Sequence, residues 1–207
     1  LAPGFIDGHV HIESSMVTVP EYARAVVPQG TTTVIADPHE IANVWGEKGV
    51  RYILHSARDV PLNVFVMLPS CVPATDMETA GALLGPDSLA GLLREEGVIG
   101  LAEVMNYPGV IFRDPQLMDK IRLAGGRLVD GHAPRLSGQD LSAYICAGIR
   151  SDHECTTLAE ADEKLFSGMF IMLREGSAAS NLSELLPLIT PENSRHFLFV
   201  SDDRHPR

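Results

Sequence analysis

The sequence predicts an α/β fold, namely a (β/α)8 barrel of the TIM type that is truncated after its eighth strand. Eight short apolar runs recur along the chain, and amphipathic segments with helical spacing lie between them. This alternation is typical of parallel strands connected by helices. Apolar residues make up 45% of the 207 residues, which is enough to form a large buried core.

Buried parallel strands account for the eight apolar runs. Most runs are rich in Val, Ile, Leu or Phe and lack the polar alternation of a half-exposed strand. The third, fourth and eighth runs are the clearest, whereas the fifth and sixth are more polar. In chain order, the predicted strands are residues 5–11, 32–36, 62–68, 98–104, 127–132, 148–153, 169–173 and 197–201.

Helices are predicted between the strands from apolar spacing and from residues that begin and end helices. Pro20 and Pro115 stand where a first helical turn tolerates proline, and Asp114 is a candidate N-cap. Gly30 follows the end of the first helix. The predicted helices are residues 20–27, 47–58, 88–96, 114–124, 137–147, 157–166 and 183–188.

An open doubly wound sheet is the main alternative to the barrel. Two features argue against this alternative. The number of predicted strands reaches eight, and no GxGxxG motif follows the first strand. The barrel is therefore the preferred fold.

Composition restricts the partners and the compartment. The net charge of −11 argues against a nucleic-acid partner, because binding to phosphates requires clustered Lys and Arg. Cys71, Cys146 and Cys155 are widely spaced and form no CxxC pair, which is typical of a reduced cytosolic protein. No apolar run approaches membrane-spanning length, and no signal peptide opens the chain. We therefore expect a cytoplasmic protein that binds neither nucleic acid nor a membrane.

The two ends of the chain lie next to predicted strands. The chain starts at Leu1 without a methionine and stops at Arg207 just after the eighth apolar run. We therefore expect residues 1–207 to be a fragment of a longer protein.

The strongest local motif is His9-Val10-His11, at the end of the first predicted strand. Residues i and i+2 of a strand point to the same face, so both imidazoles can bind one metal ion. Histidine is the usual ligand for zinc and also suits iron. Two polar residues at a barrel mouth are the alternative explanation of this motif.

Further metal-ligand side chains stand at the ends of other predicted strands. In a barrel, these carboxyl ends meet at one face, where such enzymes build their active sites. Taken singly, each residue has a structural explanation as a core ion pair, a loop histidine or a cap. Their common position favours a metal site instead. The residues are Glu103, His132, His153 and Asp202, at the ends of the fourth, fifth, sixth and eighth strands.

Several longer stretches carry a resemblance to a known family. Residues 3–11, Pro-Gly-Phe-Ile-Asp-Gly-His-Val-His, resemble the opening of the amidohydrolase superfamily barrel. Residues 11–16, 37–44, 103–110 and 202–206 are similar to the adenine deaminase branch of that superfamily. The resemblance extends from end to end of the chain. It implies that residues 1–207 are a catalytic metal-dependent hydrolase barrel, with a flanking β domain and a carboxy-terminal region absent.

The resemblance also implies a binuclear divalent metal centre that contains manganese, iron or zinc. The two first-strand histidines would bind one metal, and the histidines of the fifth and sixth strands would bind the other. Glu103 stands where a carboxylated lysine often bridges the metals, and Asp202 would contact the centre and move protons. The implied metal ligands are His9, His11, Glu103, His132, His153 and Asp202.

The implied reaction is the hydrolytic deamination of adenine to hypoxanthine and ammonia by a metal-activated hydroxide. The alternatives are another amidohydrolase-type deaminase, a cyclic amide hydrolase, or an inactive metal-binding fragment. The implied partner is a small-molecule purine substrate in purine metabolism, and we expect a homo-oligomer in the full-length protein.

Other polar residues are candidates for contact with the substrate. Glu154, beside His153, is a candidate catalytic residue that protonates a ring nitrogen, or else a surface carboxylate at the start of the next helix. His39 and Glu40 follow the second strand, where they would hold substrate, support the ligands or bind an extra metal, or else cap the next helix. Asn43 and Asp203 are further candidate substrate-binding residues. The single tryptophan, Trp45, would stack on a purine or serve in packing.

Overall fold

The computed structural model describes residues 1–206, so Arg207, the last residue of the predicted domain, lies outside the described residues. The strands form two parallel sheets, one of six strands in the order β5-β4-β3-β2-β1-β9 and one of three in the order β6-β7-β8. The strands of this part of the chain are β1 (Phe5–His11), β2 (Thr31–Ala36), β3 (Asn63–Leu68), β4 (Val98–Val104), β5 (Leu128–Gly131), β6 (Ser151–Asp152), β7 (Phe170–Arg174), β8 (Phe197–Val200) and β9 (Asp202–Asp203).

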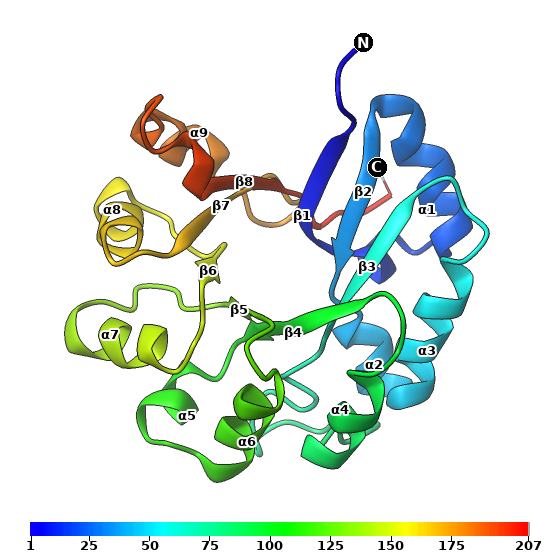
Figure 1. The fold of residues 1–207 in the computed structure, drawn as a ribbon, viewed down its shortest axis with the longest axis horizontal. Coiled ribbons are helices and arrows are strands. Elements are labelled where there is room, and N and C mark those ends of the chain that lie inside the picture. The colour runs from blue at the N-terminus through cyan, green and yellow to red at the C-terminus, as the bar shows by residue number, and fades with distance from the viewer. Residues whose placement is uncertain (207) are drawn as a thin grey trace.

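Helices surround the strands on the outside (Figure 1). None of the helices within residues 1–206 is long and apolar enough to cross a membrane. The α-helices are α1 (Val19–Val26), α2 (His39–Trp45), α3 (Glu47–Ser56), α4 (Pro86–Leu92), α5 (Tyr107–Ile111), α6 (Pro115–Leu123), α7 (Gly138–Cys146), α8 (Leu158–Phe166) and α9 (Leu182–Leu185). The 3-10 helices are η1 (Ile12–Ser15), η2 (Val27–Gln29), η3 (Leu186–Leu188) and η4 (Ser194–His196).

The strands follow one another around a common centre in chain order from β1 to β8 (Figure 1). The two sheets approach each other at both edges. The amide of Arg150 donates to the carbonyl of Val129 at 3.1 Å next to β5 and β6, and a Cβ placed on Gly8 of β1 would lie 3.3 Å from the side chain of Val200. No paired register joins the sheets at either edge within residues 1–206. The predicted parallel α/β architecture is confirmed, while its hydrogen bonding forms two sheets.

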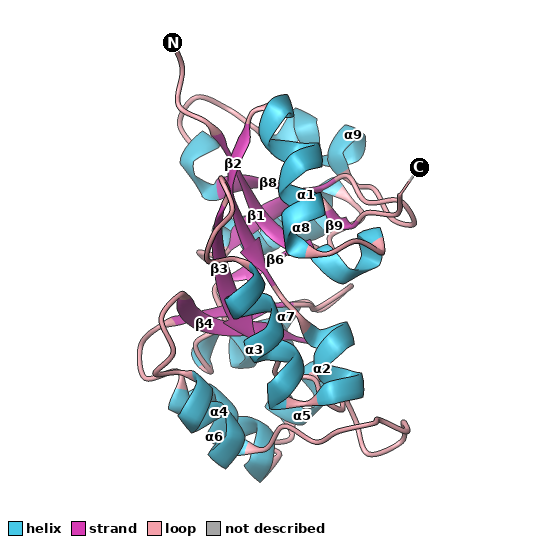
Figure 2. Ribbon diagram, turned by 90° about the vertical axis from the view of Figure 1, so that its right-hand side faces the viewer, coloured by secondary structure: helices cyan, strands magenta, loops and turns pink. Residues whose placement is uncertain are grey.

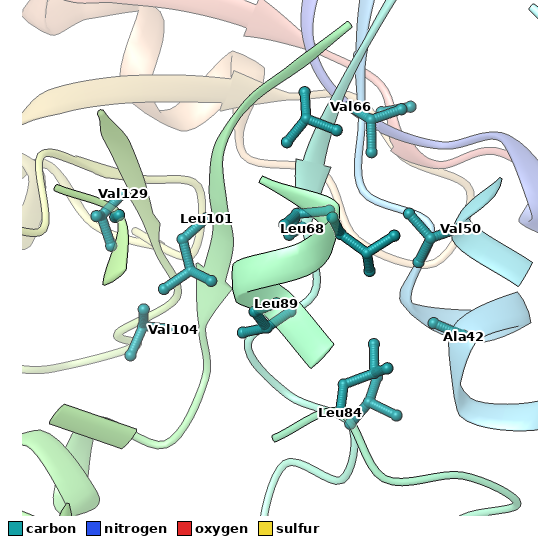
Figure 3. Packing of buried hydrophobic residues seen from close by; sticks show 14 of the residues in the cluster. Ala42, Val50, Val66, Leu68, Leu84, Leu89, Leu101, Val104 and Val129 are labelled. Carbon is teal, nitrogen blue, oxygen red and sulfur yellow. The ribbon is translucent and has the colours of Figure 1, made fainter. Parts of the chain in front are cut away.

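The main core lies between the strands and the surrounding helices (Figures 1 and 2). Val66 and Leu68 of β3 are fully buried, as are Val50 of α3 and Leu89 of α4, and Figure 3 shows these side chains packed together. Burial of apolar area stabilises the fold by about 25 cal/mol per Å². This packing holds the carboxyl ends of the strands in place.

Several helix signals have the effect that the sequence predicts. The Asp114 carboxylate accepts a hydrogen bond from the amide of Leu117 at 2.8 Å, and Pro115 occupies the first position of α6. Gly30 ends η2 in the left-handed region, with φ 102°, where glycine carries no steric cost. These short-range interactions explain why the predicted helix positions are accurate to within a few residues.

Some elements differ from the prediction. The sixth strand contains two residues, not the six of 148–153, because only Ser151 and Asp152 pair with β7. Two short helices, α2 and α5, form after β2 and β4 in segments for which no helix was predicted. In α5, the Asn106 side chain accepts from the amide of Gly109 at 2.9 Å and so caps a five-residue helix. Such short helices lack the apolar period that reveals longer ones.

Apolar side chains are exposed around the first and last long strands. Phe5 and Ile6 of β1 are 70% and 60% exposed, and Phe199 of β8 is 63% exposed. They line an open cavity of about 830 Å³ together with residues of α1. Exposed apolar patches of this kind favour association.

We therefore expect the polypeptide of residues 1–207 to self-associate in solution. Phe199→Ser should weaken this association, because it removes an aromatic ring from the cavity wall. Sedimentation velocity over a range of protein concentrations measures the effect. Phe166→Ser is the matched control, since Phe166 is 93% exposed on α8 and does not line the cavity. A monomer at every concentration would contradict the prediction.

Candidate metal centre

The structure brings the six predicted metal-ligand side chains together at the carboxyl ends of the strands. Two come from the end of β1 and one from β4, and two lie directly after β5 and β6. The last lies in β9, which pairs with β1 on the edge opposite β2. The six side chains are His9, His11, Glu103, His132, His153 and Asp202.

The two histidines of β1 face each other through ring nitrogens. The distance between the Nε2 atoms of His9 and His11 is 3.1 Å. Nδ1 of His9 lies 3.2 Å from a carboxylate oxygen of Asp130, and Nδ1 of His11 lies 2.9 Å from the backbone carbonyl of Asp37. Both Nδ1 atoms therefore act as donors, and both Nε2 atoms are directed into the cluster. Such an arrangement is typical of metal-binding histidines oriented by hydrogen bonds to a carboxylate or carbonyl.

Glu103 lies between this histidine pair and a second pair. Its Oε1 is 3.5 Å from Nε2 of His11. Its Oε2 is 2.6 Å from Nδ1 of His132 and 3.3 Å from Nε2 of His153. Burial alone would raise the pKa of Glu103, but hydrogen bonds from His132 and His153 lower that pKa well below its usual value. The carboxylate is therefore charged, with one oxygen directed towards each pair.

The second pair of histidines is also close. Nδ1 of His132 lies 3.3 Å from Nε2 of His153, and the His153 ring stacks on the His9 ring with 4.5 Å between centroids. Nδ1 of His153 is buried and has no hydrogen-bond partner within the described residues. The four imidazoles thus form one continuous group.

Asp202 completes the cluster from β9. Its Oδ1 lies 3.1 Å from Nε2 of His11 and 3.6 Å from Nε2 of His9. Its Oδ2 accepts a hydrogen bond from Arg174 at 2.9 Å. Burial alone would raise the pKa of Asp202, but hydrogen bonds from His11 and His9 hold it below its usual value. The residue has φ 54°, a left-handed conformation that aspartate tolerates better than most residues.

The donor set of the cluster fits divalent cations. Nε2 of His9 and Nε2 of His11 lie 3.1 Å apart, close enough for one cation to contact both. Candidate ligand atoms of His9, His153 and Asp202 lie within 4.8 Å of one another, as do those of Glu103, His132 and His153. Nitrogen and carboxylate donors of this kind suit zinc, iron and manganese. The residues present can therefore hold a divalent cation.

The candidate substrate residues lie around this cluster. Nδ1 of His39 is 3.0 Å from Asp37 and 3.3 Å from Oε1 of Glu103. Glu40 accepts a hydrogen bond from Ser14 at 3.0 Å, and Ser14 also donates to Asp203. His39 and Glu40 are the first two residues of α2, whose N-cap is Pro38. Capping of this helix is therefore not their role.

Glu154 belongs to the cluster and does not lie on the surface of a helix. One of its carboxylate oxygens forms an ion pair with Arg174 and lies 3.5 Å from Nε2 of His153. The alternative of a surface carboxylate at the start of the next helix is therefore wrong.

Two further candidates, Asn43 and Trp45, lie on α2. Asn43 is half-buried, and its side-chain oxygen has no hydrogen-bond partner within residues 1–206. Trp45 is 55% exposed at the end of the helix and lies 6.4 Å from the ring of Tyr52. The structure thus places Trp45 in packing on the outside of the molecule.

Three charged residues of the site were not predicted. Asp37 follows β2 directly, Asp130 lies in β5 two residues before His132, and Arg174 is the last residue of β7. Their positions at strand ends are the signal that could have found them. All three are buried and contact the predicted ligands or their neighbours, so they orient the cluster.

Comparison with known proteins agrees with this geometry. The sequence model of the Amidohydrolase family matches residues 1–187. Adenine deaminase from Desulfatibacillum aliphaticivorans is 57% identical over the whole chain, which covers 37% of that protein. Adenine deaminase from Clostridium acetobutylicum is 53% identical over the whole chain, which covers 36% of that protein. The chain thus spans little more than a third of the length of these relatives.

Solved structures show the same fold at low sequence identity. The structure of A. niger ochratoxinase superimposes with a TM-score of 0.51 at 14% identity and covers 99% of this chain and 63% of that protein. This likeness concerns the fold alone. The match of the family model to residues 1–187 covers most of the sequence, and the chain therefore belongs to the amidohydrolase family.

Proposed function

We propose that residues 1–207 form the catalytic domain of a hydrolase that converts adenine to hypoxanthine and ammonia. The observation that carries this proposal is Glu103, which directs one oxygen towards the β1 histidines and the other towards His132 and His153. The relatives named adenine deaminase, at 53% and 57% identity, support adenine as the substrate. In the whole protein we propose a closed eight-stranded barrel, a homo-oligomer, a cytoplasmic location and a role in purine metabolism.

The proposed cofactor is a pair of divalent cations, namely manganese, iron or zinc. His9 and His11 would hold one cation and His132 and His153 the other, while Glu103 and Asp202 would supply carboxylate ligands. When bound, such cations lower the pKa of water and supply a nucleophile near neutral pH. The protein residues then have to orient the substrate and move protons.

Asp202 is placed to move the proton. Its Oδ1 faces the histidine cluster at 3.1 Å from His11, so it can accept the proton of the attacking water and return it to the leaving amino group. Arg174 holds Oδ2 at 2.9 Å and so keeps Oδ1 directed towards the cluster. Glu154, on the other side of Arg174, would in its protonated form donate a hydrogen bond to a ring nitrogen and make the purine carbon more electrophilic.

The remaining polar residues of the rim would bind the purine. A purine presents several ring nitrogens and an exocyclic amino group, which require both donors and acceptors. His39 and Asn43 offer donors, and the unpaired side-chain oxygen of Asn43 is also an acceptor. The carboxylates of Glu40 and Asp203 would accept hydrogen bonds from N–H groups. These assignments rest on the positions of three of the residues in α2, which follows β2, and of Asp203 in β9.

The test is metal analysis together with turnover. We expect the protein loaded with Mn²⁺, Fe²⁺ or Zn²⁺ to bind two cations per chain and to release ammonia from adenine, with hypoxanthine as the product. Chelation should abolish turnover, and added cation should restore it. Dihydroorotate serves as the control, because it is a cyclic amide. Hydrolysis of dihydroorotate without deamination of adenine would contradict the proposed substrate.

A further inference from the structure

The two sheets are not paired with each other next to His132 and His153, whose distance from each other matters for binding a cation. His132 follows β5 and His153 follows β6, yet no paired register joins these two strands within residues 1–206. The backbones come close, since a Cβ on Gly131 would lie 2.2 Å from the carbonyl oxygen of Ser151. Other interactions must therefore set the distance between the two histidines.

A fully buried lysine supplies such interactions. Lys164 lies on the core face of α8, three residues after the buried Ala161, and its side chain is 0% exposed. Its ammonium donates to the carbonyl of Ala133 at 2.6 Å, to Asp152 at 2.9 Å and to Glu160 at 2.8 Å. All three donors of the ammonium are therefore used.

Asp152 contacts the same two backbone segments. Its Oδ1 accepts a hydrogen bond from the amide of Ala133 at 2.8 Å. Its Oδ2 accepts from Lys164 and, at 3.3 Å, from the amide of Glu154. Ala133 directly follows His132, and Asp152 directly precedes His153. The Lys164–Asp152 pair thus joins the peptide segments that carry both histidines.

Stability alone does not explain this ion pair. An apolar side chain is the usual occupant of the core face of a helix, and replacement of buried ion pairs by apolar residues is often neutral or stabilising. Burial alone would lower the pKa of Lys164, but Asp152 raises it above its usual value. The lysine is therefore charged, and its contacts define a geometry that an apolar residue would not define.

We propose that Lys164 is a positioning residue that, through Asp152 and the carbonyl of Ala133, sets the spacing of His132 and His153 for the cation that they hold. This role rests on the proposed binuclear centre. The role concerns only one of the two cations. The contacts of the Lys164 ammonium and of Asp152 join the segments that carry His132 and His153. None of these contacts is made with His9 or His11.

The test is the Lys164→Met variant of the metal-loaded protein, titrated with a chromophoric chelator. Loss of a residue that orients a ligand costs about 10–100-fold in metal affinity. We expect one of the two Zn²⁺ ions to be released at a chelator concentration lower by that factor, while the other is released as in the wild type. The kcat should fall with the loss of this cation and recover when Zn²⁺ is added in excess, because the catalytic residues remain.

Two further variants separate positioning from folding. Leu185→Ala removes a fully buried side chain from the apolar cluster that also contains Ala161. It should lower the melting temperature but leave both Zn²⁺ affinities unchanged. Should Lys164→Met fail to fold, Lys164→Met with Asp152→Asn relieves the unpaired buried carboxylate, and it should show the same selective loss.

The positioning role would be overturned if a folded Lys164 variant bound both Zn²⁺ ions with equally reduced affinity, or if neither affinity changed. A wild-type protein that binds fewer than two Zn²⁺ ions would overturn the binuclear centre, and the role of Lys164 with it. The wild-type titration therefore distinguishes failure of the proposed function from failure of this inference.

Discussion

Asp202→Asn is expected to lower kcat for adenine by about 10²–10⁴-fold, the usual contribution of a positioned acid or base. Asparagine has nearly the same shape and can still accept the hydrogen bond that Arg174 donates to Oδ2 at 2.9 Å. It cannot accept the proton of the attacking water. KM should change much less than kcat, because the contacts with the substrate remain.

Steady-state kinetics of ammonia release, with metal content measured on the same samples, check this prediction. Two cations should remain bound to Asp202→Asn, since the four histidines and Glu103 are intact. Asp140→Asn is the matched control, because Asp140 is exposed on α7 and lies outside the cluster. Near-normal kcat in Asp202→Asn would mean that another residue moves the proton.

Glu103→Gln is expected to weaken the binding of both cations by more than about 100-fold, the upper end for residues that only orient ligands. The amide carries no charge, and only its oxygen can bind a cation. The carboxylate oxygens lie 3.5 Å from His11 on one side and 2.6 Å from His132 on the other, so its replacement disturbs both halves of the centre. Turnover should be undetectable without added metal.

Equilibrium dialysis against Zn²⁺ or Mn²⁺ measures the two affinities directly. Glu95→Gln is the control, because Glu95 is a half-exposed carboxylate paired with Arg51 at the surface. If Glu103→Gln lost one cation and kept the other at full affinity, Glu103 would be a ligand of a single cation and the bridging role would be rejected. The pattern differs from that of Asp202→Asn, which should lose turnover and keep its metals.

Much of the fold was predictable because the signals are local. Val, Ile, Leu and Phe concentrate in the strand runs, and prolines and Asp114 mark helix starts, so β1 and β4 have the predicted bounds. β6 was predicted too long, at 148–153, and the helices α2 and α5 were not predicted, because elements of two to seven residues contain too little of a repeating pattern. β6 forms through its pairing with β7, and α5 depends on the cap that Asn106 provides.

The sequence by itself determined which side chains stand at strand ends. His9 and His11 share a face because of the two-residue period of a strand, and Glu103, His132 and His153 end strands or directly follow them. These relations depend only on neighbours along the chain, and parallel strands bring their carboxyl ends to one edge. The family resemblance rests on the same segments.

Only the tertiary structure decided which partners orient these side chains. Asp130 meets His9 across 121 positions of the sequence, Arg174 meets Asp202 across 28, and Lys164 meets Ala133 across 31. No local period encodes such pairs, because each depends on how neighbouring strands and helices pack. Burial makes these pairs important for orientation. A charged group that is removed from water loses its hydration, and only the few polar atoms within hydrogen-bond distance can replace it.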